Sequence, residues 1–211
     1  MKPSDRRYFL GAGAGLAAMG VMPACSAALL TTPAQSTGPF YPLELPLDSD
    51  NDLVQVAGQS EPAAGQVLNL GGRVLGADGR PAPGLRVEIW QCDAFGIYHH
   101  PGDGRGPADP NFQGFGHTVA DGEGAYRFRT IVPTVYPGRT PHIHVKVLGE
   151  GVEALTTQMY VAGNPENERD GLYRQLGRAS ELVTVSLEPD GDAMRALFDI
   201  VLGPDGVPNS G

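Results

Sequence analysis

The 211-residue sequence has little cysteine and fewer basic than acidic residues. Its two cysteines, Cys25 and Cys92, stand far apart, so the sequence predicts no disulfide framework. Lysine and arginine together number 15, against 24 aspartates and glutamates, which gives a formal net charge of -9. Such an acidic chain argues against nucleic acid or an anionic membrane as a partner. It does not exclude a small anionic substrate, because one buried arginine can reverse the local field.

Long hydrophobic runs are scarce as well. The uncharged apolar run from Leu10 to Met22 has 13 residues, which is too short to span a bilayer but typical of a signal-peptide core. Basic residues precede this run and small residues follow it, so we expect residues 1–28 to be an export leader. We expect no other segment to cross a membrane.

The leader resembles the twin-arginine type of signal, because Arg6 and Arg7 are followed by Phe9-Leu10 in DRRYFLGAG. This route exports proteins that are already folded. An ordinary secretory leader is the alternative, and either type predicts a periplasmic or cell-envelope location. Because MPAC loosely resembles a lipid-attachment sequence, a lipid anchor at Cys25 is also considered.

Glycine and proline interrupt the rest of the sequence, with 30 glycines and 19 prolines. This composition favours many short strands joined by turns over a helical bundle. Alternation of polar and apolar residues indicates half-buried strands, here in VLNLGGRVL, LRVEIWQC, AYRFRTIV, HIHVKVLG, LTTQMYV and ELVTVSLEP. One short helix is expected around residues 167–176, with Asn164-Pro165 as its start.

The sequence therefore predicts an all-β fold, an antiparallel β-sandwich over residues 67–206 with short helical and loop insertions. A proline-containing arm, residues 29–66, precedes this domain, and residues 207–211 form a tail. An arm of this kind lies across the surface of its own domain or reaches a neighbouring subunit, which points toward a homo-oligomer.

The segment PHIHVKV carries the first candidate metal ligands. In a strand, His142 and His144 share one face with Lys146, while the apolar residues between them share the other. With a rise of about 3.3 Å per residue, the two histidine Cα atoms would lie roughly 6.6 Å apart, so both imidazoles could bind one metal. Taken alone, a His-x-His pair is more often a polar strand face.

Two tyrosines and an arginine stand near these histidines. Tyr136 and Arg139 lie within six residues of His142 in VPTVYPGRTPHIH, a segment that its prolines restrict. Tyr98 ends WQCDAFGIYHH, where a strand runs into a glycine-containing turn. No carboxylate in these segments has a spacing that suggests a triad of two histidines and a carboxylate. Phenolate is a hard anionic ligand. Ionising a phenol at neutral pH costs free energy, and ferric iron is the metal that best offsets this cost.

These segments resemble the intradiol ring-cleavage dioxygenases and are most similar to the beta-subunit type of the protocatechuate 3,4-dioxygenases. The matching segments are TTPAQSTGPFYP, GLRVEIWQCDAFGIYHHPGD, PNFQGFGHTVADGEGAYRFRTIVPTVYPGRTPHIHVKV and LTTQMYVAGNPEN, which run from about Thr31 to Asn167. The pattern Tyr, then Tyr-Pro-x-Arg-x-x-His-x-His, is far more specific than any of its parts.

The resemblance implies a non-haem Fe(III) enzyme that inserts O2 into a catechol, protocatechuate-like or otherwise substituted. The product would be a cis,cis-muconate-type diacid, formed in aromatic compound catabolism. The implied iron ligands are Tyr98, Tyr136, His142 and His144. The implied catalytic residues are Arg139 over the substrate ring, Gln158 in the pocket, and Tyr136 as the ligand that substrate displaces. Gly38, Phe40 and Tyr160 are expected to border the substrate pocket.

Two features depart from the family pattern. Ile97 stands where a basic or polar residue is common before the tyrosine. The spacing from Tyr136 to His142 is shorter than in the protocatechuate enzymes. The shorter spacing leaves the ligands intact but puts protocatechuate itself in doubt as the substrate.

Other interpretations of the sequence stay open at this point. GGRVLGADGRPAPGLRVEIW also resembles the opening of a transthyretin-like β-sandwich, a module that often binds ligands without catalysis. A copper or zinc enzyme that uses only His142 and His144 is a second alternative. The remaining loop histidines, His99, His100 and His117, are predicted to be solvated. Cys92, Trp90 and Tyr126 are predicted to pack in the core or beside the pocket.

Overall fold

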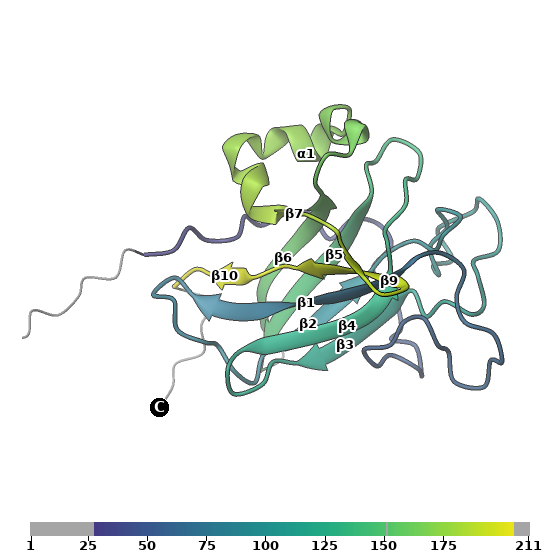
Figure 1. Ribbon diagram of the computed structural model, residues 1–211, viewed down its shortest axis with the longest axis horizontal. Helices are drawn as coiled ribbons and strands as arrows, with labels where there is room; N and C mark the ends of the chain where they lie inside the picture. Colours follow the sequence, from purple (N-terminus) through teal and green to yellow (C-terminus); the bar gives the residue numbers. More distant parts are fainter. Residues whose placement is uncertain (1–27, 151, 205–211) are drawn as a thin grey trace, which may run out of the picture.

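The computed structural model describes residues 28–150 and 152–204 of the chain (Figure 1). Residues 1–27 of the predicted leader and the predicted tail, 207–211, lie outside the described residues. The strands are β1 Val67–Gly76, β2 Arg86–Trp90, β3 Phe115–Val119, β4 Ala125–Ile131, β5 His142–Gly149, β6 Val152–Val161, β7 Thr184–Val185, β8 Glu188–Asp190, β9 Ala193–Leu197 and β10 Ile200–Leu202. Strands dominate the regular structure, so the predicted all-β class is confirmed.

The strands form two sheets. In the first, β1 pairs with β4, β9 and β10, and β8 pairs with β9; the second has the order β3-β2-β5-β6-β7. Both sheets are mixed, because β1 runs parallel to β9 and β10, and β6 runs parallel to β7. The expectation of a purely antiparallel arrangement is therefore wrong. Alternation reports which face of a strand is buried, and it carries no information about the direction of the neighbouring strand.

Both sheets contribute side chains to one hydrophobic core. Leu68 and Leu70 on β1 and Ile143, Val145 and Val147 on β5 are each at most 1% exposed and belong to the same apolar cluster. This confirms the apolar face predicted for PHIHVKV. Because a shift by one residue would turn these side chains outward, the core fixes the register of β5 and therefore the direction of the residues on its other face.

Three short helical segments follow β6: η1 Pro165–Glu168, α1 Gly171–Gln175 and η2 Gly177–Val183. The Asn164 side chain accepts the backbone N–H of Glu166, so the predicted start at Asn164-Pro165 is confirmed. The predicted continuous helix over 167–176 is wrong. Asp170 has an extended backbone and caps α1, which separates it from η1. Within the described part of the chain, no helix has the length and apolar character needed to cross a membrane.

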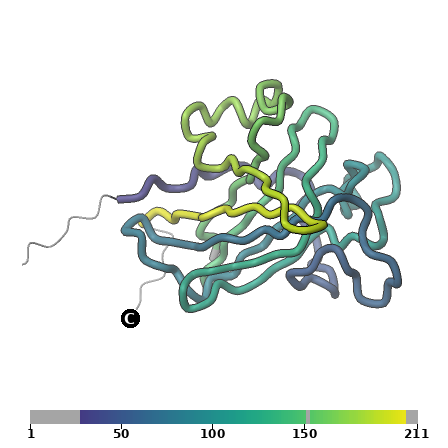
Figure 2. Tube along the Cα trace, viewed as in Figure 1, coloured from purple at the N-terminus to yellow at the C-terminus, as the bar shows by residue number. Residues whose placement is uncertain are grey.

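The N-terminal segment packs along its own chain. The backbone N–H of Thr32 donates to the Val201 carbonyl, and the Thr32 hydroxyl accepts the Val201 N–H. The beginning and the end of the described chain therefore lie side by side (Figure 2). Further along, Leu53 and Val54 are 0% and 1% exposed within the core. The segment that the sequence predicts as an arm thus also supplies core residues.

The contact between β1 and the turn after β9 predicts different effects at two adjacent glycines. A Cβ atom on Gly72 would lie 2.0 Å from the carbonyl oxygen of Phe198, whereas one on Gly71 would find its nearest neighbour at 3.5 Å. Gly72→Ala should therefore lower the free energy of unfolding by about 2–3 kcal/mol. Gly71→Ala should change it by less than about 1 kcal/mol. Urea unfolding measures both, and equal effects would contradict the close approach at Gly72.

Candidate metal and substrate site

His142 and His144 lie on the face of β5 opposite the core residues. Strand pairing sets His144 beside Trp90 on β2 and Gln158 on β6, and sets His142 beside Tyr160. Both histidines are 1% exposed, and their Nε2 atoms lie 3.2 Å apart. The two imidazoles therefore face one another within hydrogen-bonding distance, away from solvent.

Different contacts hold the two rings. His142 Nδ1 lies 2.7 Å from the Thr140 carbonyl oxygen, so Nδ1 carries a hydrogen and Nε2 presents a lone pair in the neutral ring. His144 Nδ1 is buried without a hydrogen-bond partner among the described residues, and its ring stacks on Trp90 at 4.7 Å between centroids. Burial lowers the pKa of His142 to about 4 and that of His144 well below its ordinary value. Both rings are thus available as neutral metal ligands.

Two tyrosines complete the cluster. Tyr98 lies in the turn after β2, where its backbone N–H donates to the Asp103 carboxylate at 2.8 Å, and Tyr136 lies in the loop before β5. The ring centroids of the two tyrosines are 5.5 Å apart. Tyr136 lies 5.6 Å from His142, and Tyr98 lies 6.2 Å from His144. The structure brings together the four side chains that the sequence predicts as ligands.

Both phenols need a cation in order to ionise near neutral pH. Burial raises the pKa of Tyr98 well above its ordinary value, and its hydroxyl has no hydrogen-bond partner within the described residues. Burial also raises the pKa of Tyr136, although the nearby Arg139 opposes this shift. A directly bound metal reverses the preference and favours phenolate.

The ligand types narrow the choice of metal. Among residues 28–150 and 152–204, no group of three or more His, Cys, Asp or Glu side chains could hold a metal ion. A metal bound beside His142 and His144 would therefore take its anionic ligands from the two tyrosines. Two neutral imidazoles and two phenolates with a buried, unpaired Tyr98 hydroxyl fit a hard trivalent ion such as Fe(III).

Each side of the Arg139 guanidinium has its own partner. Its Nε donates to Asp170 at 2.8 Å, its Nη2 donates to Gln158 Oε1, and its Nη1 lies 3.5 Å from the Tyr136 hydroxyl. The side chains of Arg139 and Asp170 are 13% and 0% exposed. The planar guanidinium is thereby fixed as a positive charge next to Tyr136.

Gln158 and Tyr160 connect this cation to the N-terminal segment. The Gln158 side chain is fully buried; its Oε1 also accepts the Tyr160 hydroxyl at 3.1 Å, and its Nε2 donates to the Ser36 carbonyl at 3.0 Å. The Tyr160 hydroxyl in turn accepts Gln35 Nε2 at 2.9 Å. Tyr160 is itself 0% exposed, so it contacts the site through Gln158 and the His142 ring.

Gly38 and Phe40 lie over the ligand cluster. Gly38 has a φ of +72°, and a Cβ atom there would lie 3.2 Å from His144 Cε1, so conformation and space both favour glycine. Phe40 stacks on Tyr98 at 4.7 Å and meets Tyr136 edge-on at 6.2 Å between centroids. Gly38 and Phe40, two of the three residues predicted to border the pocket, therefore pack against predicted ligands.

The sequence interpretation missed Asp170. Its carboxylate accepts Arg139 Nε, the Thr140 N–H and the Leu172 N–H, so it links the loop before β5 to the start of α1. Burial raises the pKa of Asp170, but the hydrogen bonds from Arg139 and Thr140 outweigh burial, and the net pKa is lowered. An aspartate before a short helix is an ordinary N-cap. Nothing local in the sequence connects it to an arginine 31 positions earlier.

A second missed pair, Asp103 and Arg105, lies beside the tyrosines. Hydrogen bonds from Arg105 lower the pKa of Asp103 to about 2, and the same carboxylate accepts the Tyr98 N–H. The Arg105 guanidinium carbon lies 5.2 Å from the centroid of the Tyr136 ring, within the range of a cation–π contact. This loop shows no alternation from which its contacts could be predicted.

Two of the three histidines predicted to be solvated in loops differ from that prediction, and His117 lies in β3 and not in a loop. His99 is exposed, as expected. His100 is half-buried and meets Phe40 edge-on at 5.7 Å, and His117 is half-buried opposite Glu88 on β2, so the prediction of solvated rings is wrong for these two. Segments distant in the sequence cover them. Cys92, Trp90 and Tyr126 are buried, which confirms their prediction.

Known proteins are similar to this chain in sequence and fold. Residues 36–204 match the family model described as Dioxygenase. The chain is 37% identical over 174 residues to the protocatechuate 3,4-dioxygenase beta chain of Burkholderia cepacia, covering 75% of this chain and 74% of that one. It is 30% identical to the hydroxyquinol 1,2-dioxygenase of Corynebacterium glutamicum, covering 82% of this chain but 64%, less than two thirds, of that relative.

A solved structure supports the same relationship. The dioxygenase domain of a dioxygenase carbohydrate-binding protein fusion from Streptomyces sp. SirexAA-E matches with a TM-score of 0.64 and 31% sequence identity. The match covers 82% of this chain and 98% of that domain.

One substitution separates the two roles of Asp170. Its Oδ1 caps α1, whereas its Oδ2 accepts from Arg139 and Thr140. Asp170→Asn can keep the cap, but its amide group would face two N–H donors, so we expect a loss of about 2–4 kcal/mol in the free energy of unfolding.

The control is Arg169→Gln, which removes a neighbouring ion pair whose arginine is 75% exposed. This substitution should lower the free energy of unfolding by less than about 1 kcal/mol. Urea unfolding compares the two variants, and an equally small loss for Asp170→Asn would contradict its role as the anchor of Arg139.

Proposed function

This chain belongs to the intradiol ring-cleavage dioxygenases, and we propose that it uses a ferric ion to open a catechol ring between its two hydroxyl groups. The residues proposed to hold the iron are Tyr98, Tyr136, His142 and His144. The observation that carries this proposal is the convergence of these two phenols and two buried imidazoles, with the Nε2 atoms 3.2 Å apart.

The family match supports the choice of iron, and so does the ligand chemistry. When bound, the ferric ion would act as a Lewis acid that draws electron density from the catecholate. The protein would supply neutral imidazoles, because burial lowers the pKa of His142 and His144. It would also exclude water, since Tyr98 and both histidines are at most 3% exposed.

The two tyrosines are suited to different roles in the proposed reaction. Tyr98 is buried, stacked on Phe40 and tied through its backbone to Asp103, so it would stay in place during turnover. Tyr136 is partly exposed on a proline-rich loop. We infer that Tyr136 Oη is the atom that accepts a proton from the catechol when substrate binds.

Arg139 would stabilise negative charge as it develops on the substrate oxygens. Its guanidinium is held by Asp170 and Gln158 and reaches Tyr136, so it requires little reorientation during the reaction. Gln158 would keep the guanidinium in this orientation and could not move freely, because it also bonds to Tyr160 and Ser36.

The proposed reaction adds both atoms of O2 to the substrate and breaks the bond between the two hydroxyl-bearing carbons. The product is a cis,cis-muconate-type diacid, which fits a role in aromatic compound catabolism. Similar proteins are named for protocatechuate, hydroxyquinol and catechol, whose shared part is the catechol nucleus. The short spacing between Tyr136 and His142 favours a substituted catechol other than protocatechuate itself.

A transthyretin-like binding module is the alternative, and the site argues against it. Such a module has no need of two tyrosines and two histidines gathered at one buried point, nor of an arginine fixed by Asp170.

We also propose that the protein is exported to the periplasm or cell envelope. The proposal rests on the sequence of the leader, residues 1–28, with its paired arginines, short apolar run and following small residues. Detection of the protein in a periplasmic or membrane fraction, and N-terminal sequencing of that material, would test it.

Replacement of one phenol tests the proposed reaction. Iron-loaded protein should be red, through tyrosinate-to-iron charge transfer, and should consume O2 with a catechol. Tyr98→Phe removes one phenolate ligand, so the band should weaken and O2 uptake should fall by more than about 100-fold. Uptake is followed with catechol, hydroxylated aromatic acids and hydroxyquinol, with identification of the products.

Tyr173→Phe is the matched control, because Tyr173 lies in α1 and bonds to Thr184. It should keep the colour and the O2 uptake. A colourless iron-loaded protein, or one that consumes O2 with none of these substrates, would contradict the proposed function.

A further inference from the structure

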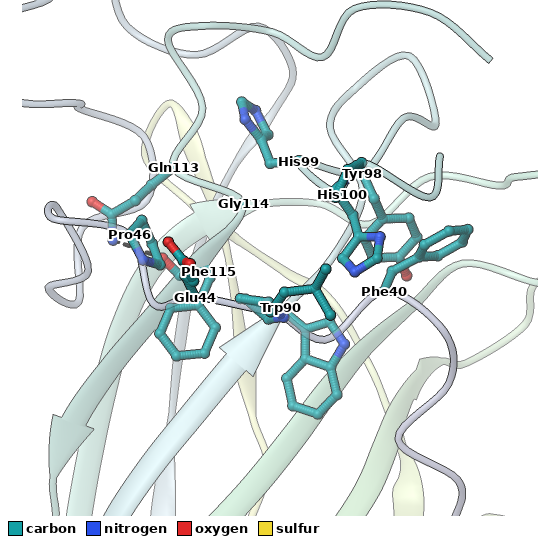
Figure 3. A pocket seen from close by; sticks show the side chains of 13 residues that line it. Phe40, Glu44, Pro46, Trp90, Tyr98, His99, His100, Gln113, Gly114 and Phe115 are labelled. Atoms are coloured by element: carbon teal, nitrogen blue, oxygen red, sulfur yellow. Dashed lines mark hydrogen bonds between the residues drawn. The ribbon is translucent and has the colours of Figure 1, made fainter. Parts of the chain in front are cut away.

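A cavity of about 380 Å³ lies beside Tyr98. Its walls come from the N-terminal segment, the end of β2, the turn that follows β2 and the start of β3 (Figure 3). None of its lining residues belongs to the cavity that contains Tyr136 and Arg139. Its volume falls within the range of about 300–1,000 Å³ that is typical of small-molecule sites.

Several aromatic rings line this cavity. Phe40, Trp90 and Phe115 line it together with Tyr98. Figure 3 shows Phe40, Tyr98 and His100 on one side, Phe115, Glu44 and Gln113 on the other, and Trp90 between them. Flat apolar walls of this kind suit a planar ring.

The same walls carry polar atoms without partners. In the described part of the chain, eight buried side-chain nitrogen and oxygen atoms make no hydrogen bond. Three of these atoms belong to residues that line this one cavity and are not assigned to the metal site: Trp90 Nε1, His100 Nε2 and Gln113 Oε1. Trp90 is 1% exposed and Gln113 is 7% exposed. Buried polar groups are normally satisfied, so this concentration points to a ligand with hydrogen-bonding groups.

The unpaired atoms offer both donors and an acceptor. Trp90 Nε1 is always a donor. His100 Nδ1 accepts the Gly102 N–H at 3.0 Å, so in the neutral ring Nε2 carries the hydrogen and donates. Gln113 already uses its Nε2 to donate to Asp50 and Phe115, which leaves Oε1 as the acceptor. A hydroxyl group on the ligand is chemically able to accept from either of the first two groups or to donate to the third.

The charge of the cavity selects against acids. Glu44 is exposed and lines the cavity, and no lysine or arginine is among the described residues that line it. A carboxylate group on the ligand would therefore meet a like charge and no cation in the lining.

We propose that this cavity receives the second, uncharged phenolic or phenyl ring of a two-ring catechol, while the catechol ring occupies the metal site. The assignment rests on the proposed function, because it names the substrate class of that same site. Tyr98 and Phe40, which stack on each other, line the cavity and also contact Tyr136 of the ligand cluster. A catechol that carries a neutral aryl group should therefore be a better substrate than catechol itself.

The single tryptophan of the chain, Trp90, lines the cavity and also stacks on His144, so its fluorescence reports binding without turnover, and the variants described below identify binding in the cavity. The probe is para-phenylphenol, which has two rings but no catechol and cannot be cleaved. It should change the Trp90 emission saturably, and para-phenylbenzoate should bind more weakly. His100→Phe keeps an aromatic ring against Phe40 but removes the donor. This variant should raise the dissociation constant of para-phenylphenol by about fivefold.

Charge reversal provides the matched comparison. Glu44→Lys should shift the preference between the neutral probe and the carboxylate probe by at least about fivefold in favour of the carboxylate. Glu181→Lys makes the same change at an exposed residue that lines none of the cavities described above, and should leave the preference unchanged. An unresponsive Trp90, or equal shifts in the two variants, would overturn the proposal.

O2 uptake separates this proposal from the proposed reaction. The ratio of kcat/KM for phenylcatechol to that for catechol should exceed one in the unaltered chain and fall in His100→Phe. If catechols are consumed but this ratio stays below one in the unaltered chain, the cavity assignment fails and the reaction stands. If para-phenylphenol binds with the expected charge preference but no catechol is consumed, the reaction is rejected and the cavity still binds a phenolic ring.

Discussion

Burial of two neutral imidazoles on one strand is the constraint on which the rest of the site depends. The apolar residues of β5 are packed in the core, so His142 and His144 are directed together to the opposite face. Their Nε2 atoms lie 3.2 Å apart in surroundings that lower the pKa of both rings. Two imidazoles held in this way need a shared proton or a shared cation between them. The phenols of Tyr98 and Tyr136, which burial keeps protonated, ionise only if that cation is a metal.

The surroundings of this pair come from segments that are distant in the sequence. The N-terminal segment contributes Gly38 against His144 and Phe40 against Tyr98. The start of α1 contributes Asp170, which fixes Arg139 and so fixes the positive charge beside Tyr136. Because each contact satisfies a buried polar group or fills space beside an aromatic ring, loss of one segment would loosen the others. The N-terminal segment, predicted as an arm, is therefore part of the site.

Charge is distributed unevenly around this site, although the chain as a whole is acidic. Arg139 and Arg105 both lie near the Tyr136 ring, on the side where negative charge would develop during the proposed reaction. The cavity on the Tyr98 side has Glu44 and no cation among its described lining residues. A substrate that joins a catechol to a neutral ring would match both sides, which is the physical link between the proposed reaction and the proposed substrate class.

The sequence by itself determined the all-β class and the buried face of β5, since both follow from local alternation, and its resemblance to a known family implied the four candidate ligands. It also located the start of the helical region at Asn164-Pro165. Only the tertiary structure decided that β9 and β10 run parallel to β1, that Asp170 anchors Arg139, and that His100 borders a cavity. Alternation and spacing describe a few neighbouring residues. Strand direction and contacts between distant segments depend on how the loops return the chain, which no local pattern encodes.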